Sequence, residues 1–372
     1  MQGTQVDTTG AAGWQAYRAR RRFGNLDGLR FICIFMVLWH HFTPFPYLEQ
    51  WLGFRRGFLG VDFFFVLSGY LITTLLLREA DETGGISLRG FYMRRILRII
   101  PVYFFVVTCV SGYFIVVKGR SELLELLPFY YLFLSNFLID HIPLLTITWS
   151  LSVEEQYYML WPLLVVLLPL RILIPVCLAF VAVNLALHMG AFGGPFERYA
   201  GPLRVILPSA AYTPIILGSL AAILLHRRRG YALLDAIAGW RGAALTGFAV
   251  MGVLFQVLPG NLTGLPSFAI HLTMTYCLIA LLVREKNALS PFLQQRLVAR
   301  IGAISYGIYL YHLIVLDVTH RILPTASLPK WVVFIVFAVL ACLVAEVSFR
   351  TLERYFQRFR PTPKRPSSER PA

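Results

Sequence analysis

The chain has 372 residues, of which 57% are hydrophobic and only 14% charged, with a mean hydropathy of +0.65. Because soluble globular proteins carry about 25% charged residues, this composition excludes them and predicts an all-α polytopic membrane protein. The net charge of +15 does not indicate a nucleic-acid partner, since the basic residues cluster at the ends of apolar runs, as the positive-inside rule requires.

The two ends of the chain are polar. We expect residues 1–23 to be a disordered, basic cytoplasmic tail and residues 351–372 to be a second one, because both lack the apolar content of a core. No small-residue cleavage site follows the first apolar run, so we interpret it as a retained helix and not as a signal peptide. The segment 24–350 is then one transmembrane domain.

Apolar runs along this domain predict about ten transmembrane helices. The runs are 29–46, 58–77, 99–117, 151–170, 172–190, 211–225, 243–258, 266–283, 303–320 and 331–348. With ten spans, the basic segments and both termini face the cytoplasm. An eleventh span at 123–139 would place the basic segment 226–230 outside. We therefore expect 123–139 to be a re-entrant or interfacial segment, and we accept Arg55 and Arg56 on the outer side.

The first run, 26–42, begins with Asp27 and Arg30 and ends with His40 and His41. His41 follows Arg30 by eleven positions, a helix rise of about 16 Å. If Arg30 lies at one face of a hydrocarbon core about 30 Å thick, His41 lies near its centre. A titratable ring there is a functional-site hypothesis, although Asp27 and Arg30 can also neutralise each other as an i, i+3 pair.

Two further segments carry polar residues near the membrane. GVDFFFVLSGYLI at 60–72 contains Asp62 and the pair Ser68–Gly69, which equally suits plain helix packing. ISLRGFYMRRILR at 86–98 is a basic amphipathic helix that runs into the third span. Its arginines favour either anionic-lipid anchoring or a site for a phosphate-bearing ligand, and the ones that we assign to such a site are Arg94, Arg95 and Arg98.

Two later segments complete the polar set. TWSLSVEEQYYMLWP at 148–162 contains Trp149, Ser150, Glu154 and Glu155. A charge at the centre of a membrane costs about 2.5–3.5 kcal/mol even on the insertion scale, so we expect at least one carboxylate to have a cationic partner or to be protonated. ISYGIYLYHL at 304–313 contains His312, for which a hydrogen-bonded structural role is the simpler interpretation.

Together these residues favour acyl transfer. His41 suits a general base, Glu154 or Glu155 suits its orienting group, and Arg30 lies on the same helix. We assign Arg94, Arg95 and Arg98, with Ser68 and Gly69, to the phosphates and thioester of an acyl-CoA. The acceptor site is assigned to the remaining polar residues, Asp62, Trp149, Ser150, His40 and His312. The five cysteines lie apart within apolar runs, so we expect no disulfide and no metal.

A proton-coupled transporter or exporter of a polysaccharide or metabolite is the alternative, because buried His, Glu and Arg also form proton relays. A non-enzymatic scaffold for polysaccharide assembly is a third hypothesis. No Gly-rich phosphate loop, GxSxG or HExxH motif is present, which disfavours soluble hydrolase or kinase chemistry.

In order along the chain, the strings LDGLR…HH, GVDFFFVLSGYLI, RRILRIIP, WSLSVEEQYYMLWP and SYGIYLYHL resemble the acyltransferase 3 family of bacterial integral-membrane O-acyltransferases, in its stand-alone form. The resemblance implies His41 as the base with Arg30 as its partner, and Arg95 and Arg98 as donor-binding or structural residues. It implies an acyl-CoA donor, most often acetyl-CoA, and a hydroxyl acceptor on a polysaccharide, peptidoglycan, a lipid-linked sugar or a macrolide. The location implied is the bacterial cytoplasmic (inner) membrane.

Overall fold

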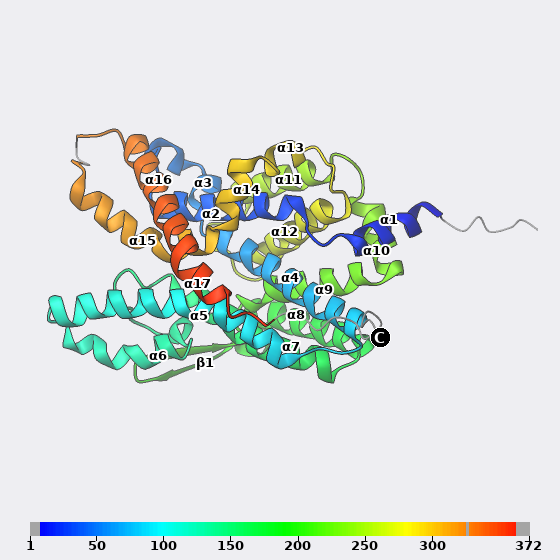
Figure 1. Cartoon of the computed structure of the whole chain (residues 1–372), viewed down its shortest axis with the longest axis horizontal. Helices are drawn as coiled ribbons and strands as arrows, with labels where there is room; N and C mark the ends of the chain where they lie inside the picture. The colour runs from blue at the N-terminus through cyan, green and yellow to red at the C-terminus, as the bar shows by residue number, and fades with distance from the viewer. Residues whose placement is uncertain (1–7, 325–326, 362–372) are drawn as a thin grey trace, which may run out of the picture.

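The computed structural model describes residues 8–324 and 327–361, which form a bundle of helices with one small sheet (Figure 1). In chain order the α-helices are α1 (Thr8–Ala19), α2 (Gly24–His41), α3 (Leu52–Arg55), α4 (Leu59–Thr83), α5 (Leu88–Gly112), α6 (Leu127–Tyr131), α7 (Thr148–Leu167), α8 (Leu170–His188), α9 (Tyr212–His226), α10 (Arg228–Ala238), α11 (Ala243–Val257), α12 (Leu265–Val283), α13 (Ser290–Leu293), α14 (Arg296–Ala303), α15 (Ser305–Ile322), α16 (Lys330–Ser348) and α17 (Arg354–Gln357). Each predicted apolar run coincides with one of these helices.

Several helices are suited to a bilayer. Among the described residues, five are long and apolar enough to cross a membrane, or up to seven if α10 with α11 and α14 with α15 each form one bent span. The chain is therefore a multi-pass membrane protein, but the predicted count of ten spans is not confirmed. The helices α2 and α7 coincide with predicted runs and fall outside the five, because their charged residues lower their mean hydropathy.

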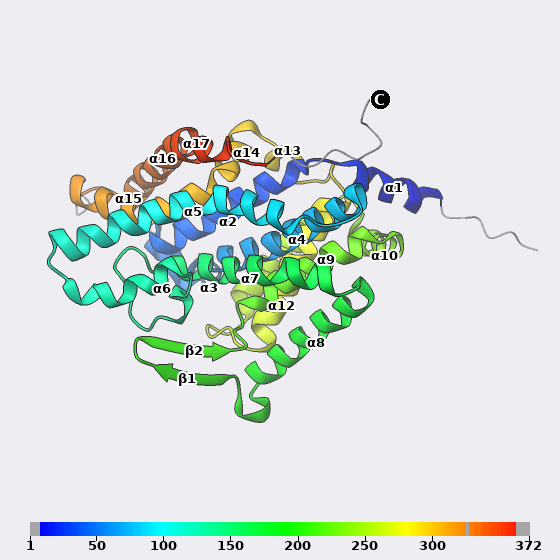
Figure 2. The same cartoon turned by 60° about the horizontal axis from the view of Figure 1, so that its bottom comes forward.

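The segment 123–139 is a series of short helical turns, Ser121–Leu126, α6 and Ser135–Phe137. It does not form one helix of membrane-spanning length, and its re-entrant or interfacial placement stays a prediction. It meets a hairpin that the sequence analysis missed, in which β1 (Phe196–Ala200) pairs antiparallel with β2 (Leu203–Leu207), through a bridge between Leu138 and Leu203. Figure 2 shows this hairpin beside α8 at the edge of the bundle.

The expected disorder of residues 1–23 is wrong for the part that the structure describes. Residues Thr8–Ala19 form α1, which packs against α10 and α12. Tyr17 is buried and its hydroxyl lies 2.9 Å from that of Tyr70, while the indole of Trp14 donates to the carbonyl of His226. These two aromatic side chains give the basic segment an apolar face. Residues 1–7 lie outside the described residues.

The second predicted tail, 351–372, also begins as ordered helix. A π-helical turn, Phe349–Glu353, continues α16 into α17, and both segments pack against α5. The Glu353 side chain is buried there, where it is attracted to Arg98 and Arg360. Residues 362–372 lie outside the described residues.

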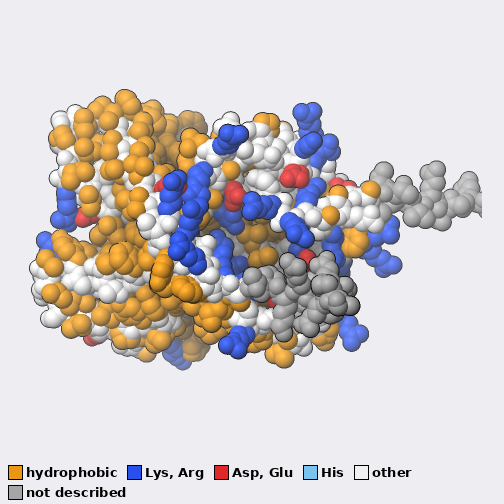
Figure 3. All heavy atoms as spheres, viewed as in Figure 1, with side chains coloured by type: hydrophobic (Ala, Val, Ile, Leu, Met, Phe, Trp, Pro, Cys, Tyr) orange, Lys and Arg blue, Asp and Glu red, His pale blue; other side chains and the backbone are white. Residues whose placement is uncertain are grey.

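Basic and apolar side chains occupy different parts of the surface. In the view of Figure 3 apolar side chains dominate the left part, around α15, α16 and α5, whereas Lys and Arg gather in the centre and towards α1. We call the α1 end the basic end. Arg56, expected on the opposite side, is almost fully buried and donates to the carbonyls of Leu254, Leu258 and Pro259. It thus satisfies the carboxyl end of α11, where helix carbonyls lack partners.

The centre of the bundle depends on close contact between α4 and α9. A Cβ at Gly69 would lie 1.9 Å from the carbonyl oxygen of Ile215, and one at Gly218 would lie 1.9 Å from that of Val66. The two backbones therefore approach through paired glycines, as small residues permit in membranes. Gly69, which we assigned to donor binding, packs here against α9.

We expect Gly69→Ala to lower the free energy of unfolding by about 1–3 kcal/mol, the usual cost of overpacking. Thermal unfolding of the detergent-solubilised chain measures this loss. Gly252→Ala is the matched control, because a Cβ on this glycine of α11 meets no atom within 4 Å. Equal melting temperatures for both variants would contradict the close α4–α9 contact.

Candidate functional site

A cavity of about 200 Å³ lies between α2, α4, α5, α7 and α15. All five polar segments predicted from the sequence contribute to its wall. The contributing polar residues are Arg30, Ser68, Arg95, Arg98, Ser150, Glu154, Tyr158, Ser305, Tyr306 and Tyr309. We call this space the central cavity.

Helical spacing decides which of the predicted residues reach it. Arg95 and Arg98 are three residues apart on α5 and share a face, and both line the central cavity. Arg94 is turned by about 100° from Arg95 and instead pairs with Glu79 at 2.8 Å. On α7, Ser150 and Glu154 share a face in the same way, whereas Glu155 does not line the cavity.

The charged groups of the cavity have specific partners. The hydroxyl of Ser68 donates to Glu154 at 2.6 Å, joining α4 to α7. Arg30 pairs with Asp27 at 2.5 Å. The guanidinium of Arg95 lies 5.4 Å from the centroid of the Tyr158 ring, a cation–π arrangement, and it is attracted to both Glu154 and Glu155.

The position of Arg30 depends on a close approach between α2 and α14. A Cβ at Gly302 would lie 1.7 Å from the carbonyl oxygen of Asp27, so only glycine allows the two backbones to meet. This contact fixes the turn of α2 that carries Asp27 and Arg30. Three arginines and one glutamate line the central cavity, and repulsion between Arg30 and Arg98 makes it a favourable place for an anion.

His41 does not line the central cavity, but a short chain of contacts connects it to the wall. Its ring centroid lies 4.7 Å from that of His312, which is completely buried. The Nδ1 atom of His312 lies 2.5 Å from the carbonyl oxygen of Tyr309, and the Tyr309 side chain lines the cavity. The Tyr309 hydroxyl in turn lies 2.6 Å from the hydroxyl of Ser150.

Both imidazoles have one nitrogen occupied by a carbonyl. His41 Nδ1 lies 2.9 Å from the carbonyl oxygen of Val37. Because a carbonyl only accepts, each Nδ1 carries a proton, and in a neutral ring Nε2 is then the acceptor. Within the described part of the chain, Nε2 of His312 is buried without a hydrogen-bond partner.

We expected His41 to pair with Glu154 or Glu155, but the structure gives these residues other partners. Glu154 bonds Ser68, and the ring beside His41 is that of His312. His40 is exposed and contacts Phe58. Trp149 packs edge-on against Phe65 of α4, with ring centroids 6.0 Å apart.

Asp62 bonds a residue that the sequence analysis did not select. Its carboxylate lies 3.1 Å from Nε2 of His271 on α12, and the His271 ring is buried. The apolar run 266–283 contains one histidine, His271, beside Tyr276 and Cys277. A histidine inside a membrane span is a candidate functional residue, so its position in the run could have identified it. Among the described residues, no three His, Cys, Asp or Glu side chains come together to hold a metal ion.

The profile of the family described as "Acyltransferase domain" matches residues 23–347. The chain belongs to the acyltransferase 3 family. The match covers nearly all of the segment 24–350 that we predicted as the transmembrane domain, and it shows that the chain contains an acyltransferase domain.

Two curated relatives from Staphylococcus aureus are similar to this chain. "Putative O-acetyltransferase SACOL0978" of strain COL is 26% identical over 381 residues, which cover 93% of this chain and 59% of that protein. "O-acetyltransferase OatA" of strain NCTC 8325 is 27% identical over 366 residues, covering 90% of this chain and 57% of that protein. The chain thus spans less than two thirds of the length of these relatives. No solved structure matches it.

We expect Asp62 and His271 to be energetically coupled, because removing Asp62 leaves the buried ring of His271 without its partner. A double-mutant cycle with Asp62→Ala and His271→Ala, measured by unfolding in detergent, should give a coupling of about 0.5–3 kcal/mol. The exposed pair Asp317–Arg321, at 2.8 Å, is the control and should give less than about 1 kcal/mol. Strictly additive effects at Asp62 and His271 would contradict this expectation.

Proposed function

We propose that this protein is an O-acyltransferase of the cytoplasmic membrane that moves an acyl group, in the simplest case acetyl, from acyl-CoA to a hydroxyl group. The acceptor belongs to a glycan, a lipid-linked sugar or a glycosylated metabolite. The observation that carries this proposal is the central cavity, in which three arginines and Glu154 from α2, α5 and α7 meet. The relatives named as O-acetyltransferases support the acetyl group.

Arg30, Arg95 and Arg98 suit the donor. Guanidinium groups bind phosphate through paired hydrogen bonds, and Arg95 and Arg98 belong to the helix that begins at the basic end. The cavity volume of about 200 Å³ is smaller than the roughly 300–1,000 Å³ of drug-sized ligand pockets. We therefore expect it to hold only the acyl end of the donor, with the donor phosphates at the arginines along its rim.

His41 suits the acceptor. With a proton on Nδ1 held by the carbonyl of Val37, Nε2 is the atom that takes the proton of the attacking hydroxyl. The oxygen of that hydroxyl forms the ester bond as the thioester C–S bond breaks, and the proton held on Nε2 then passes to the sulfur, which leaves as the thiol of coenzyme A. His312 positions the His41 ring by packing against it. The His312 ring is itself held in place, because its Nδ1 atom donates to the carbonyl of Tyr309.

We expect His41→Gln to lower acyl transfer by about 10²–10⁴-fold, the usual contribution of a general base. The measurement is release of coenzyme A from acetyl-CoA by membranes that contain the native acceptors, with mass spectrometry of cell-surface glycans and secreted metabolites to identify the acylated product. The loss should appear in kcat.

The matched control is His320→Gln, which removes an exposed imidazole at the far end of α15. This variant should transfer as fast as the wild type. Full activity in His41→Gln would eliminate His41 as the base. Substrate flux across the membrane without any acylated product would favour the transporter alternative instead.

We expect Arg98→Gln to raise the KM for acetyl-CoA by about 10–100-fold, because one charge-assisted contact to a donor phosphate contributes about 1.5–3 kcal/mol. Steady-state kinetics over a range of acetyl-CoA concentrations give KM and kcat separately. Arg89→Gln, an exposed arginine on the same helix, is the control for loss of charge. An equal KM in both variants would remove Arg98 from the donor site.

A further inference from the structure

A second hollow, of about 590 Å³, lies at the basic end, where the loop before α11 meets the loop after α12. It shares no lining residue with the central cavity. Its residues were not selected from the sequence, and the acyl-transfer proposal does not use them. We call it the basic hollow, and the lining residues that matter here are Arg241, Arg284, Lys286, Asn287 and Gln294.

The charges of the basic hollow have one sign. Arg241, Arg284 and Lys286 line it, and no carboxylate does. The nearest acidic side chain in sequence, Glu285, pairs with Arg20 at 3.3 Å. Within the described residues, the side chains of Arg241 and Lys286 form no hydrogen bond or ion pair with another residue, and both are exposed.

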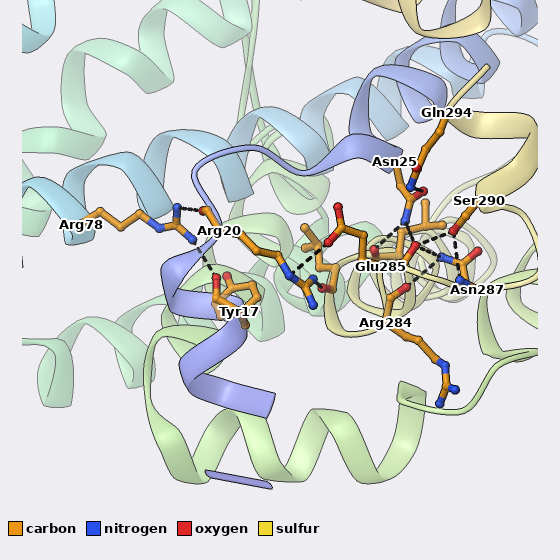
Figure 4. A network of polar contacts seen from close by, with 11 residues as sticks. Tyr17, Arg20, Asn25, Arg78, Arg284, Glu285, Asn287, Ser290 and Gln294 are labelled. Atoms are coloured by element: carbon orange, nitrogen blue, oxygen red, sulfur yellow. Dashed lines mark hydrogen bonds and ion pairs between the residues drawn. The ribbon is translucent and has the colours of Figure 1, made fainter. Parts of the chain in front are cut away.

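A network of hydrogen bonds, drawn in Figure 4, holds part of the wall of the basic hollow in place. Asn287 is buried and donates to the carbonyl of Arg284 at 2.9 Å. Gln294 donates to Asn25 at 2.9 Å, and Asn25 donates to the carbonyl of Glu285 at 2.9 Å. These bonds connect the loop that follows α12 to the first turn of α2. The cations therefore share the wall of the hollow with hydrogen-bonded amide side chains.

The basic hollow also lies at the ends of two apolar helices. The loop that carries Arg241 leads into α11, and Arg284 directly follows α12. Trp240 and Phe292, next to the lining residues, are 49% and 44% exposed. An exposed tryptophan between an apolar helix and a basic segment is typical of the membrane–water interface. We therefore expect the cations to lie at the depth of lipid headgroups.

We propose that the basic hollow binds the phosphate of an anionic phospholipid headgroup. Arg241 and Lys286 supply free donors to the phosphate oxygens, since basic pockets between membrane helices bind such headgroups. Arg284 adds charge while one of its N–H groups is held by the carbonyl of Gly239 at 3.0 Å. The exposed Trp240 and Phe292 lie beside the lipid chains.

The test uses the detergent-solubilised full chain, titrated with phosphatidylglycerol or with zwitterionic phosphatidylcholine and followed by native mass spectrometry. We expect the double variant R241Q/K286Q to bind phosphatidylglycerol roughly thirtyfold more weakly, because each cation near an anionic headgroup contributes about a factor of five. Phosphatidylcholine binding should not change. Arg284 is left in place to keep its bond to Gly239.

The matched control is R228Q/R229Q, which removes two exposed arginines of α10 that do not line the hollow, and it should bind phosphatidylglycerol as the wild type does. The charge-conserving R241K/K286R should also keep its affinity, which separates loss of charge from loss of folding. Wild-type affinity in R241Q/K286Q would overturn the proposal.

Two competition arms identify the source of the phosphate. Inorganic phosphate or coenzyme A, added at concentrations equal to the lipid, should leave phosphatidylglycerol bound. Displacement by inorganic phosphate would overturn the lipid assignment in favour of a soluble anion. Displacement by coenzyme A would overturn it in favour of the donor, and neither result bears on the role of His41.

Discussion

A charged side chain on an apolar helix needs a partner, and this constraint decides how the bundle is assembled. A central charge costs about 2.5–3.5 kcal/mol on insertion, so the helices that carry charge must converge. Glu154 receives its hydrogen bond from Ser68 on another helix, and Arg30 pairs within α2. Arg56 is satisfied by three carbonyls at the end of α11. Arg30 and Glu154 meet Arg95 and Arg98 in the wall of the central cavity.

The sequence predicted the helices and most of this convergence, because both depend on local patterns. The length of the apolar runs predicted the positions of ten helices. The polar residues inside five of these segments indicated which helices face one another. Arg95 and Arg98 share a face by spacing alone, and so do Ser150 and Glu154. Helical geometry also separates Arg94 from Arg95, although the sequence analysis grouped the two by composition and not by angle.

Other features depend on contacts between distant segments, which a single sequence does not report. Ser68 and Gly69 are adjacent, yet Ser68 lines the central cavity and Gly69 packs on α9, and only the partner helix distinguishes them. The pairing of Asp62 with His271 joins residues 209 positions apart. The α1 helix was missed because its residues are mostly small or polar. Two aromatic residues, Trp14 and Tyr17, pack against neighbouring helices.

The geometry also separates two kinds of chemistry that the sequence analysis had combined. Cations and Glu154 surround the central cavity, whereas His41 and His312 lie behind Tyr309, whose side chain forms part of the wall. A thioester held by the arginines and a hydroxyl held by His41 would therefore approach each other at Tyr309 and Ser150. In the proposed mechanism, α2 carries both a donor-binding residue, Arg30, and the base, His41, which lies eleven positions further along that helix. A donor bound at the arginines would then leave Nε2 of His41 free to accept the proton, because Nδ1 is the atom held by the carbonyl of Val37 and Glu154 is bonded to Ser68.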